Sequence, residues 1–180
     1  LSSLKNMAER YDGFGQSIKR VMEQREKHTG IIGVVADIIR VKKEFETAIE
    51  IALGGSIQNI VTDNAGTAKD MIQYLKKNKY GRATFLPLTN IRQGKEMQAD
   101  GIMEQKGVIG TASSLVEADA QYSTLVKYLL GRHIVVDNID NAIALAGKYN
   151  HTIRIVTIEG DLLNPGGTMS GGAFKNSNNL

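Results

Sequence analysis

Residues 57–75 read IQNIVTDNAGTAKDMIQYL, and this stretch decides the fold. Residues 57–62 are rich in β-branched side chains and predict a short strand. Asp63 and Asn64 come next, and both residue types are typical N-caps of a helix. Apolar side chains then recur at helical spacing, which predicts a helix whose buried stripe is Ala68, Met71, Ile72 and Leu75. A strand followed at once by a capped helix is typical of an α/β fold.

The segments on either side of this stretch also predict regular structure. Residues 42–53 place apolar side chains on one face and end at Gly54 and Gly55, which predicts a helix with a glycine C-cap. Residues 83–88 predict a second strand, and Pro87 places it at a sheet edge or a strand end. Residues 31–39 fit a strand or a turn of helix equally well.

The same order of elements recurs in the second part of the chain. Residues 45–54 match residues 122–131 at an offset of 77, and residues 61–64 match residues 135–138 at an offset of 74. Arg82, before the second strand, matches Arg154 at an offset of 72. The sequence therefore predicts a mixed α/β (α+β) fold built from two similar halves. The alternative is a chance likeness between two α/β units that share the same periods.

The amino-acid composition restricts the classes of protein to which this chain can belong. The chain has 180 residues, of which 42% are hydrophobic and 23% charged, as in an ordinary folded protein. It contains no cysteine, which excludes disulfides and thiolate chemistry and fits a reducing compartment. No apolar run approaches the roughly 20 residues of a membrane helix, and no signal-peptide pattern is present. We expect a cytoplasmic protein without a membrane partner.

No motif points to catalysis. Residues 166–171 have the glycine spacing of a phosphate-binding loop, but Gly172 and Ala173 stand where Lys and Ser or Thr are required. His28, His133 and His151 are isolated and lack the spacing of metal ligands. No Gly-x-Ser-x-Gly motif occurs. The sequence therefore predicts no enzyme, no metal and no cofactor.

One basic cluster could contact nucleic acid. The net charge of the chain is +3, yet residues 69–82 alone carry +4, from five cations against Asp70. Tyr74 and Tyr80 lie among these cations, so phosphate contacts could combine with stacking on an unpaired base. The alternative is a solvated helix face.

The first 28 residues carry a second pattern. The apolar residues Leu4, Met7, Tyr11, Phe14, Ile18 and Val21 alternate at steps of three and four, which is the spacing of a coiled-coil seam. Gly13 and Gly15 interrupt it, so residues 16–27 are predicted to form a separate helix. The alternative is an amphipathic helix that packs on its own domain. Residues 89–106 are polar, with Gly94 and Gly101, and favour a boundary between the halves.

Residues 159–172 read EGDLLNPGGTMSGG, and their paired glycines require positive φ angles or the close approach of another backbone. Together with FETAIEIALGG at 45–55, RATFLPL at 82–88, YLLG at 128–131 and VTIEGD at 156–161, this tail resembles the hinge domain of bacterial SMC (structural maintenance of chromosomes) proteins. The resemblance runs in order from about residue 28 to residue 172.

The resemblance implies a domain plan. Residues 1–28 would be the end of the ascending coiled-coil arm, 29–88 the first hinge subdomain, 89–107 a linker, 108–172 the second subdomain and 173–180 the start of the exit segment. The implied function is homodimerisation at the tip of a long coiled coil in a chromosome condensation and segregation ATPase. Its ATPase head is not in this chain, and other condensin-type subunits would bind elsewhere on the protein.

The resemblance also implies site residues. In the family the glycine tail lies in the dimer contact, which here comprises Gly160, Gly166, Gly167, Thr168, Met169, Ser170, Gly171 and Gly172. An intramolecular pair of turns is the alternative for this tail. Weak, non-specific DNA contact is expected at Lys76, Lys77, Lys79 and Arg82, with Lys19, Arg20, Arg25, Lys27 and Lys175 as a rival surface at the hinge–coil junction. The location implied is the cytoplasm, in association with the nucleoid.

A different class of function stays open on the residues alone. The loop from Gly166 to Gly172 could serve a regulatory α/β domain that binds a small molecule or phosphate. A dimer that forms without any ligand would separate the two hypotheses.

Overall fold

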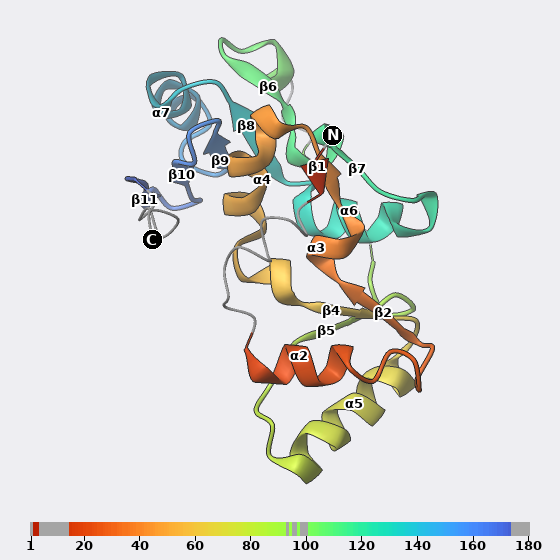
Figure 1. Ribbon diagram of the computed structural model, residues 1–180. Coiled ribbons are helices and arrows are strands. Elements are labelled where there is room, and N and C mark those ends of the chain that lie inside the picture. Colours follow the sequence, from red (N-terminus) through yellow and green to blue (C-terminus); the bar gives the residue numbers. More distant parts are fainter. Residues whose placement is uncertain (1, 4–14, 93, 95–96, 98–100, 174–180) are drawn as a thin grey trace.

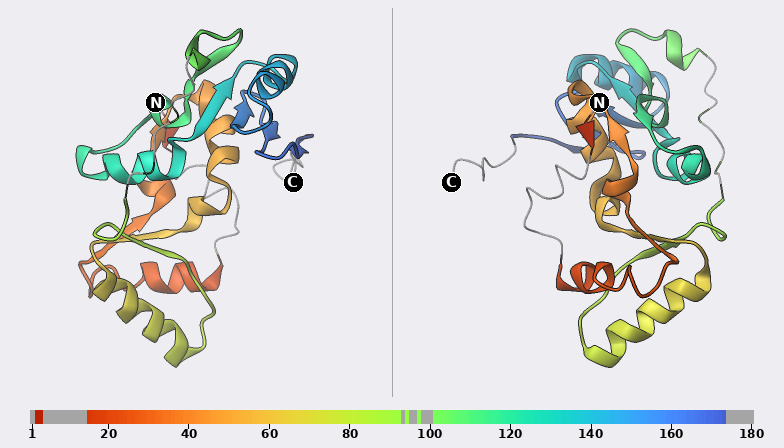
Figure 2. Two further views of the ribbon diagram at one scale, coloured as in Figure 1. Left: turned by 180° about the vertical axis from the view of Figure 1, so that it is seen from behind. Right: turned by 45° about the vertical axis from the view of Figure 1, so that its right-hand side comes forward.

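The computed structural model describes residues 2–3, 15–92, 94, 97 and 101–173 (Figure 1). The first half forms a three-stranded sheet in the order β2-β4-β5, in which β2 runs antiparallel and β5 parallel to the central strand. Helices α2 and α5 lie together at one end of the molecule, beside this sheet (Figures 1 and 2). The elements of this half are β1 (Ser2–Ser3), α2 (Gln16–Met22), β2 (Ile31–Val34), α3 (Val35–Ile38), β3 (Arg40–Val41), α4 (Glu46–Leu53), β4 (Ile60–Thr62), α5 (Ala65–Asn78) and β5 (Phe85–Pro87).

The second half repeats this plan and extends it. Its sheet has the order β11-β10-β9-β8-β6, with β6 antiparallel and β9 parallel to β8. Strands β10 and β11 continue the sheet beyond β9 as an antiparallel hairpin. The elements of this half are β6 (Val108–Thr111), β7 (Val116–Glu117), α6 (Ser123–Leu130), β8 (His133–Val136), α7 (Ile139–Lys148), β9 (Arg154–Thr157), β10 (Leu162–Leu163) and β11 (Met169–Ser170).

Corresponding strands of the two halves share fine details. The pairing of β2 with β4 shifts register at a bulge next to Gly33, and the pairing of β6 with β8 shifts at Gly110. The φ angles of these glycines are 154° and 158°, and the residues are 77 apart, the offset found in the sequence. The internal repeat is therefore a structural repeat as well.

The helix caps repeat too. The Asn64 side chain accepts a hydrogen bond from the Thr67 amide at 3.0 Å, and the Asn138 side chain accepts one from the Asn141 amide at 2.8 Å. Each cap satisfies an amide at a helix start that has no partner within the helix. The Thr67 hydroxyl also donates to Asp63, which lowers the pKa of that carboxyl below its usual value.

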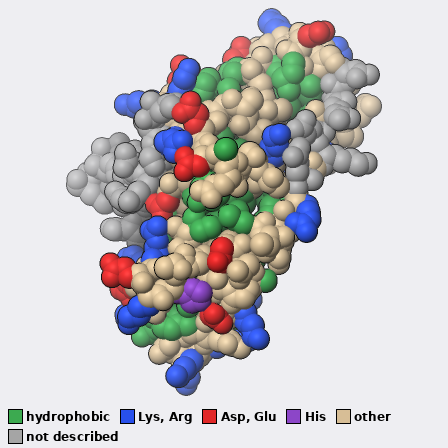
Figure 3. Space-filling view, turned by 90° about the vertical axis from the view of Figure 1, so that its right-hand side faces the viewer, with side chains coloured by type: hydrophobic (Ala, Val, Ile, Leu, Met, Phe, Trp, Pro, Cys, Tyr) green, Lys and Arg blue, Asp and Glu red, His purple; other side chains and the backbone are tan. Residues whose placement is uncertain are grey.

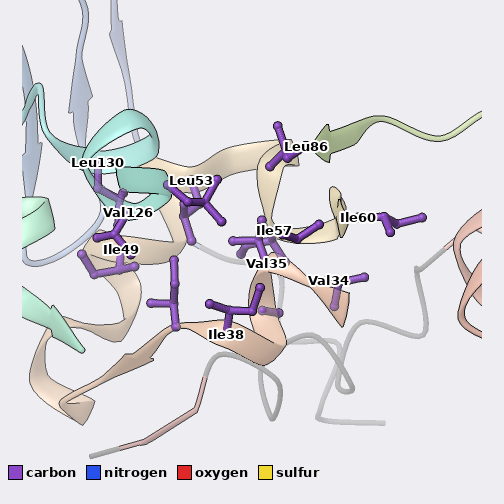
Figure 4. Close-up of a cluster of buried hydrophobic side chains, with 14 of the residues drawn as sticks. Val34, Val35, Ile38, Ile49, Leu53, Ile57, Ile60, Leu86, Val126 and Leu130 are labelled. Carbon is purple, nitrogen blue, oxygen red and sulfur yellow. The ribbon is translucent and has the colours of Figure 1, made fainter. Parts of the chain in front are cut away.

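The two halves interlock rather than sit side by side. Strand β3 of the first half pairs antiparallel with β7 of the second, with Arg40 opposite Glu117. Helix α4 of the first half contacts both α6 and β9 of the second. One hydrophobic core therefore runs through both halves, and Ile49, Leu53, Val126 and Leu130 lie close together within it (Figure 4). A second, smaller cluster lies between α7 and its own sheet.

Most predicted elements are confirmed, with corrections at their ends. The helix of residues 42–53 begins with a 3₁₀ turn (Lys43–Phe45), and residues 31–39 contain both a strand and a helical turn. The strand predicted over residues 57–62 covers only β4, because a 3₁₀ helix (Gly54–Gln58) occupies its start. Ile72 was predicted to be buried and is 40% exposed, because the buried face of α5 is narrower than the apolar stripe.

Two further expectations concern segments between elements. The seam positions Leu4, Met7, Tyr11 and Phe14 lie outside the described residues, whereas Ile18 and Val21 on α2 are buried in the core of this chain. That part of the pattern marks a helix packed on its own domain. The predicted linker contains a 3₁₀ helix (Ile102–Glu104) whose Ile102 is buried in the second cluster. The domain boundaries themselves stay a prediction.

His133 is the buried titratable group of the second half. It begins β8, and its Nδ1 atom has no hydrogen-bond partner in the part of the chain that the structure describes. Burial, and to a smaller extent the positive charge of Arg154, lowers the pKa of His133 to about 4. The folded protein therefore holds this ring neutral, because charging it in an apolar site without a partner is costly.

We expect this histidine to weaken the fold in acid. Its pKa is depressed on folding from 6.5, so the unfolded chain binds the proton more readily as the pH falls from 6.5 to about 4. Over that window the free energy of unfolding should fall by up to roughly 3 kcal/mol. Urea unfolding at several pH values measures this change. In the variant His133→Leu, the free energy of unfolding should change less with pH over this window. If it changed as much as in the wild type, the acid sensitivity would belong to other groups.

Candidate dimer interface and basic face

The glycine tail folds into the β10–β11 hairpin. Leu162 lies opposite Ser170 and Leu163 opposite Met169, and the Asn164 amide donates to the Thr168 carbonyl at 2.9 Å. The intramolecular alternative for this tail is therefore realised. Strand β11 is nevertheless the outermost strand of its sheet, so only one of its two edges is used by the chain itself.

Gly166 and Gly167 form the turn of this hairpin, with φ angles of 93° and 104° that side chains rarely adopt. The Gly166 amide donates to the His151 carbonyl at 2.8 Å, and the Gly167 amide donates to the Asn164 carbonyl at 3.0 Å. Both amides are thus used inside the chain. This geometry disfavours the alternative in which the loop from Gly166 to Gly172 binds phosphate, because phosphate binding needs such amides to point at the ligand.

Gly171 has a different role, which is close packing. A Cβ atom at this position would lie 2.6 Å from Oδ1 of Asp161. That carboxylate is held in place because it accepts a hydrogen bond from the buried Thr157 hydroxyl at 2.8 Å. Any side chain at residue 171 would therefore displace Asp161 and the end of β11.

The other residues predicted for the interface differ in exposure. Gly160 is buried within its own chain, whereas the turn and β11 are exposed, and the Met169 side chain is 52% exposed. Gly160, Gly171 and Gly172 also line an open cavity of about 310 Å³ together with Ile51, Leu162, Ser170 and Ala173. The predicted set is thus brought together at one sheet edge, with Gly160 beneath it.

Unpaired backbone groups remain on β11. In an antiparallel pair, hydrogen-bonded and non-hydrogen-bonded residue pairs alternate. The bond between residues 164 and 168 makes Leu163 and Met169 a non-hydrogen-bonded pair. The N–H and C=O groups of Met169 therefore point away from β10, toward the open edge.

A second open edge lies in the first half, on β5. This strand has β4 on one side and no described strand on the other. Thr84 accepts from Ile60 and the Leu88 amide donates to Thr62, so the intervening odd residues direct their backbone groups outward. Phe85 offers an N–H and a C=O, whereas the Pro87 carbonyl already accepts a hydrogen bond from the Asn90 amide at 2.9 Å. Sequence reasoning identified Pro87 as an edge residue but did not assign this edge to the interface.

The two predicted DNA surfaces lie on neighbouring helices. Helix α2 packs against α5, and the Ser17 hydroxyl donates to the Arg82 carbonyl at 2.6 Å. The cations of the two predicted surfaces therefore lie on neighbouring elements, with Glu23, Glu26 and Asp70 among them. We call these cations the basic face: Lys19, Arg20, Arg25, Lys27, Lys76, Lys77, Lys79 and Arg82. Lys175 lies outside the described residues. Figure 3 shows that, on the side it presents, Lys and Arg side chains alternate with Asp and Glu around a central group of hydrophobic side chains.

The tyrosines of this face already have partners. The Arg20 guanidinium lies 4.6 Å from the centre of the Tyr80 ring, and the Tyr74 and Tyr80 rings meet edge to face at 5.7 Å. Gln24 donates to the Tyr74 hydroxyl at 3.3 Å. Arg20 already covers one face of the Tyr80 ring, and Tyr74 contacts the same ring, so the geometry favours phosphate contacts over base stacking.

Comparison with known protein families identifies the family to which this fold belongs. The family described as SMC proteins Flexible Hinge Domain matches residues 28–146. The chain belongs to this family. As an SMC hinge it is 44% identical over 178 residues to the chromosome partition protein Smc of Bacillus subtilis, a match that covers 98% of this chain and 15% of that protein. It thus corresponds to a small part of its full-length relatives.

Solved SMC hinges have the same fold. An asymmetric dimer of the hinge domain of Geobacillus stearothermophilus SMC superposes with a TM-score of 0.84 at 40% identity, covering 96% of this chain and 71% of that one. The hinge domain of the Pyrococcus furiosus SMC protein superposes with a TM-score of 0.74 at 29% identity, covering 98% and 97%.

The described part of this hinge contains neither a cluster of potential metal ligands nor a helix that could span a membrane. None of its described residues form a group of three or more potential metal ligands. Within the same residues, no helix combines the length and the apolar character that crossing a membrane requires.

Proposed function

We propose that this SMC hinge forms a homodimer by joining the β11 edge of one copy to the β5 edge of the other. The observation that carries the proposal is that β11 and β5, one in each half, each end a sheet and direct unpaired backbone groups outward. A two-fold axis makes the contact twice, so the β5 and β11 edges of both copies are covered. The asymmetric dimer of the Geobacillus stearothermophilus hinge domain supports dimerisation.

Sedimentation equilibrium over a concentration series tests dimerisation. One subunit has a mass of 19.6 kDa, so a tight dimer gives about twice that value at low micromolar concentration without any added ligand. A monomer at all concentrations would contradict the proposal. A mass that doubles only when a small molecule is added would favour the regulatory ligand-binding alternative.

In the full-length protein we expect the dimer to join two coiled-coil arms at their tips, far from the ATPase heads. The hinge itself would be a binding module and not an enzyme. Its place of action would be the cytoplasm, in association with the nucleoid, and condensin-type subunits would bind other parts of the protein. The names of the relatives, which are chromosome partition proteins, support this assignment.

We further propose that the basic face binds DNA weakly and without sequence preference. What supports this is the convergence of cations from α2 and α5 on adjacent elements. Contacts of this kind release counterions, so affinity should fall steeply between low and moderate salt. Fluorescence anisotropy with single-stranded and duplex oligonucleotides measures the effect, and an affinity independent of salt would contradict phosphate contact.

Substitutions at Lys79 test the stability of α5 and the charge of the basic face separately. It ends α5 in the left-handed conformation with φ 55°, which costs a residue with a Cβ atom roughly 1 kcal/mol. Lys79→Gly should therefore raise the melting temperature while it weakens DNA binding and lowers the salt slope by about one. The matched variant Lys79→Gln should lose the same DNA affinity without the gain in stability. Unchanged DNA affinity in both variants would remove Lys79 from the binding face.

A further inference from the structure

The two halves of the chain carry opposite net charges. Residues 15–92 contain thirteen Lys and Arg against eight Asp and Glu, a net charge of +5. Residues 101–173 contain five Lys and Arg against seven Asp and Glu, a net charge of −2. The net charge of the whole chain is only +3, yet its two halves form a strong dipole because their charges are opposite in sign.

This partition continues up to the two open edges. Lys79 and Arg82 are exposed on the segment that leads into β5. Glu159 is exposed in the turn between β9 and β10, next to Gly160 and the cavity beside β11. Asp161 adds a second negative charge to that turn, although its carboxylate is engaged by Thr157. Cations therefore lie beside the β5 edge. Two anions lie in the turn that leads into the β10–β11 hairpin, where Arg154 also donates to the Asn164 side chain at 3.3 Å.

Two copies related by a two-fold axis can meet in two ways. If first half met first half, two halves of charge +5 would face one another across one contact. If first half meets second half, +5 faces −2 at both contacts. Like charges placed opposite one another across an interface disfavour association, and opposite charges accelerate the encounter.

We propose that the opposite charges of the two halves select the pairing of first half with second half and speed up dimerisation. This inference rests on the proposed edge-to-edge dimer and specifies how that dimer chooses its partner surface. Because the charges flanking the edges are exposed, their effect on the encounter is screened when the Debye length falls to a few ångströms at high salt. The association rate should therefore depend on ionic strength more than the dissociation rate does.

A charge-reversal experiment distinguishes the two pairings. Arg82→Glu reverses one of the two cations on the segment that leads into β5, and Glu159→Lys reverses the exposed anion in the turn beside β11. In a dimer of first half with second half, each variant alone replaces one pair of opposite charges with a pair of like charges at both contacts. Mixing the two variants forms a heterodimer in which one contact has both signs reversed and the other has neither. Opposite charges then meet at both contacts. Arg82→Lys, which keeps the charge, is the matched control.

The readout is the association rate itself. Differently labelled copies are dissociated in a low concentration of urea and diluted into buffer with about 0.02 M or about 0.5 M salt, and stopped-flow fluorescence follows their association. The wild-type association rate should fall about tenfold or more between the two concentrations. Each reversal alone should slow association several-fold at low salt, and the mixture should recover the wild-type rate. Association of wild-type protein that is independent of salt, or a mixture no faster than the single variants, would overturn the inference while leaving the dimer intact. A wild-type chain that stays monomeric would instead contradict the proposed function.

Discussion

Met169→Pro should convert the dimer into a folded monomer. Proline has no N–H, and the Met169 amide points away from β10 toward the open edge, so no hydrogen bond within the chain is lost. Each of the two contacts in the dimer would lose a donor and leave a carbonyl of the partner without one. At about 1.5 kcal/mol for each contact, Kd should rise more than about a hundredfold.

Sedimentation equilibrium gives the change in Kd, and circular dichroism shows whether the monomer is folded. Met169→Ala is the matched control, because it shortens the side chain but keeps the amide. It should remain dimeric within about tenfold of the wild-type Kd. If Met169→Pro dimerised as tightly as the wild type, backbone pairing at β11 would be excluded.

Leu130→Ala should destabilise the fold strongly. Leu130 is fully buried at the end of α6, in the core that both halves share, beside Val126 and Leu53 (Figure 4). Removing its side-chain methyl groups loses burial and leaves a cavity that interlocked elements cannot close. We expect the free energy of unfolding to fall by about 3 kcal/mol.

Ile143→Ala is the control for this change, since Ile143 is also on a helix but is 47% exposed. It should alter stability by no more than about 0.5 kcal/mol. Urea unfolding with a comparison of m-values makes the measurement. A loss at Leu130 as small as that at Ile143 would mean that the shared core contributes little to the fold.

Local signals explain which elements were predictable. The Asn64 cap and the stripe through Ala68 and Leu75 lie within one helix, so short-range pattern was enough to find α5. Ile72 shows the limit of that pattern. Periodicity gives the direction of a side chain around the helix, but how much of that face is covered depends on elements that come from elsewhere in the chain.

Long-range contacts explain what was missed. The pairing of β3 with β7 joins residues 40–41 to residues 116–117, and neither two-residue strand has a periodic signal of its own. The resemblance led to the glycine tail, and Pro87 predicted an edge or end position for residues 83–88, but only the sheet order suggested that this edge complements the tail. The tail glycines also proved to have roles within their own chain, a turn at Gly166 and Gly167 and close packing at Gly171.

The crossing of α4 into the second half has a mechanical consequence. A pull on this domain cannot draw its halves apart without exposing the buried side chains of Ile49 and Leu130 to water. The proposed contacts between copies, by contrast, rest on a few backbone hydrogen bonds at strands of two or three residues. In the proposed dimer the contacts within each copy would therefore resist load better than the contacts between copies, and a pull would separate the copies while each copy stays folded.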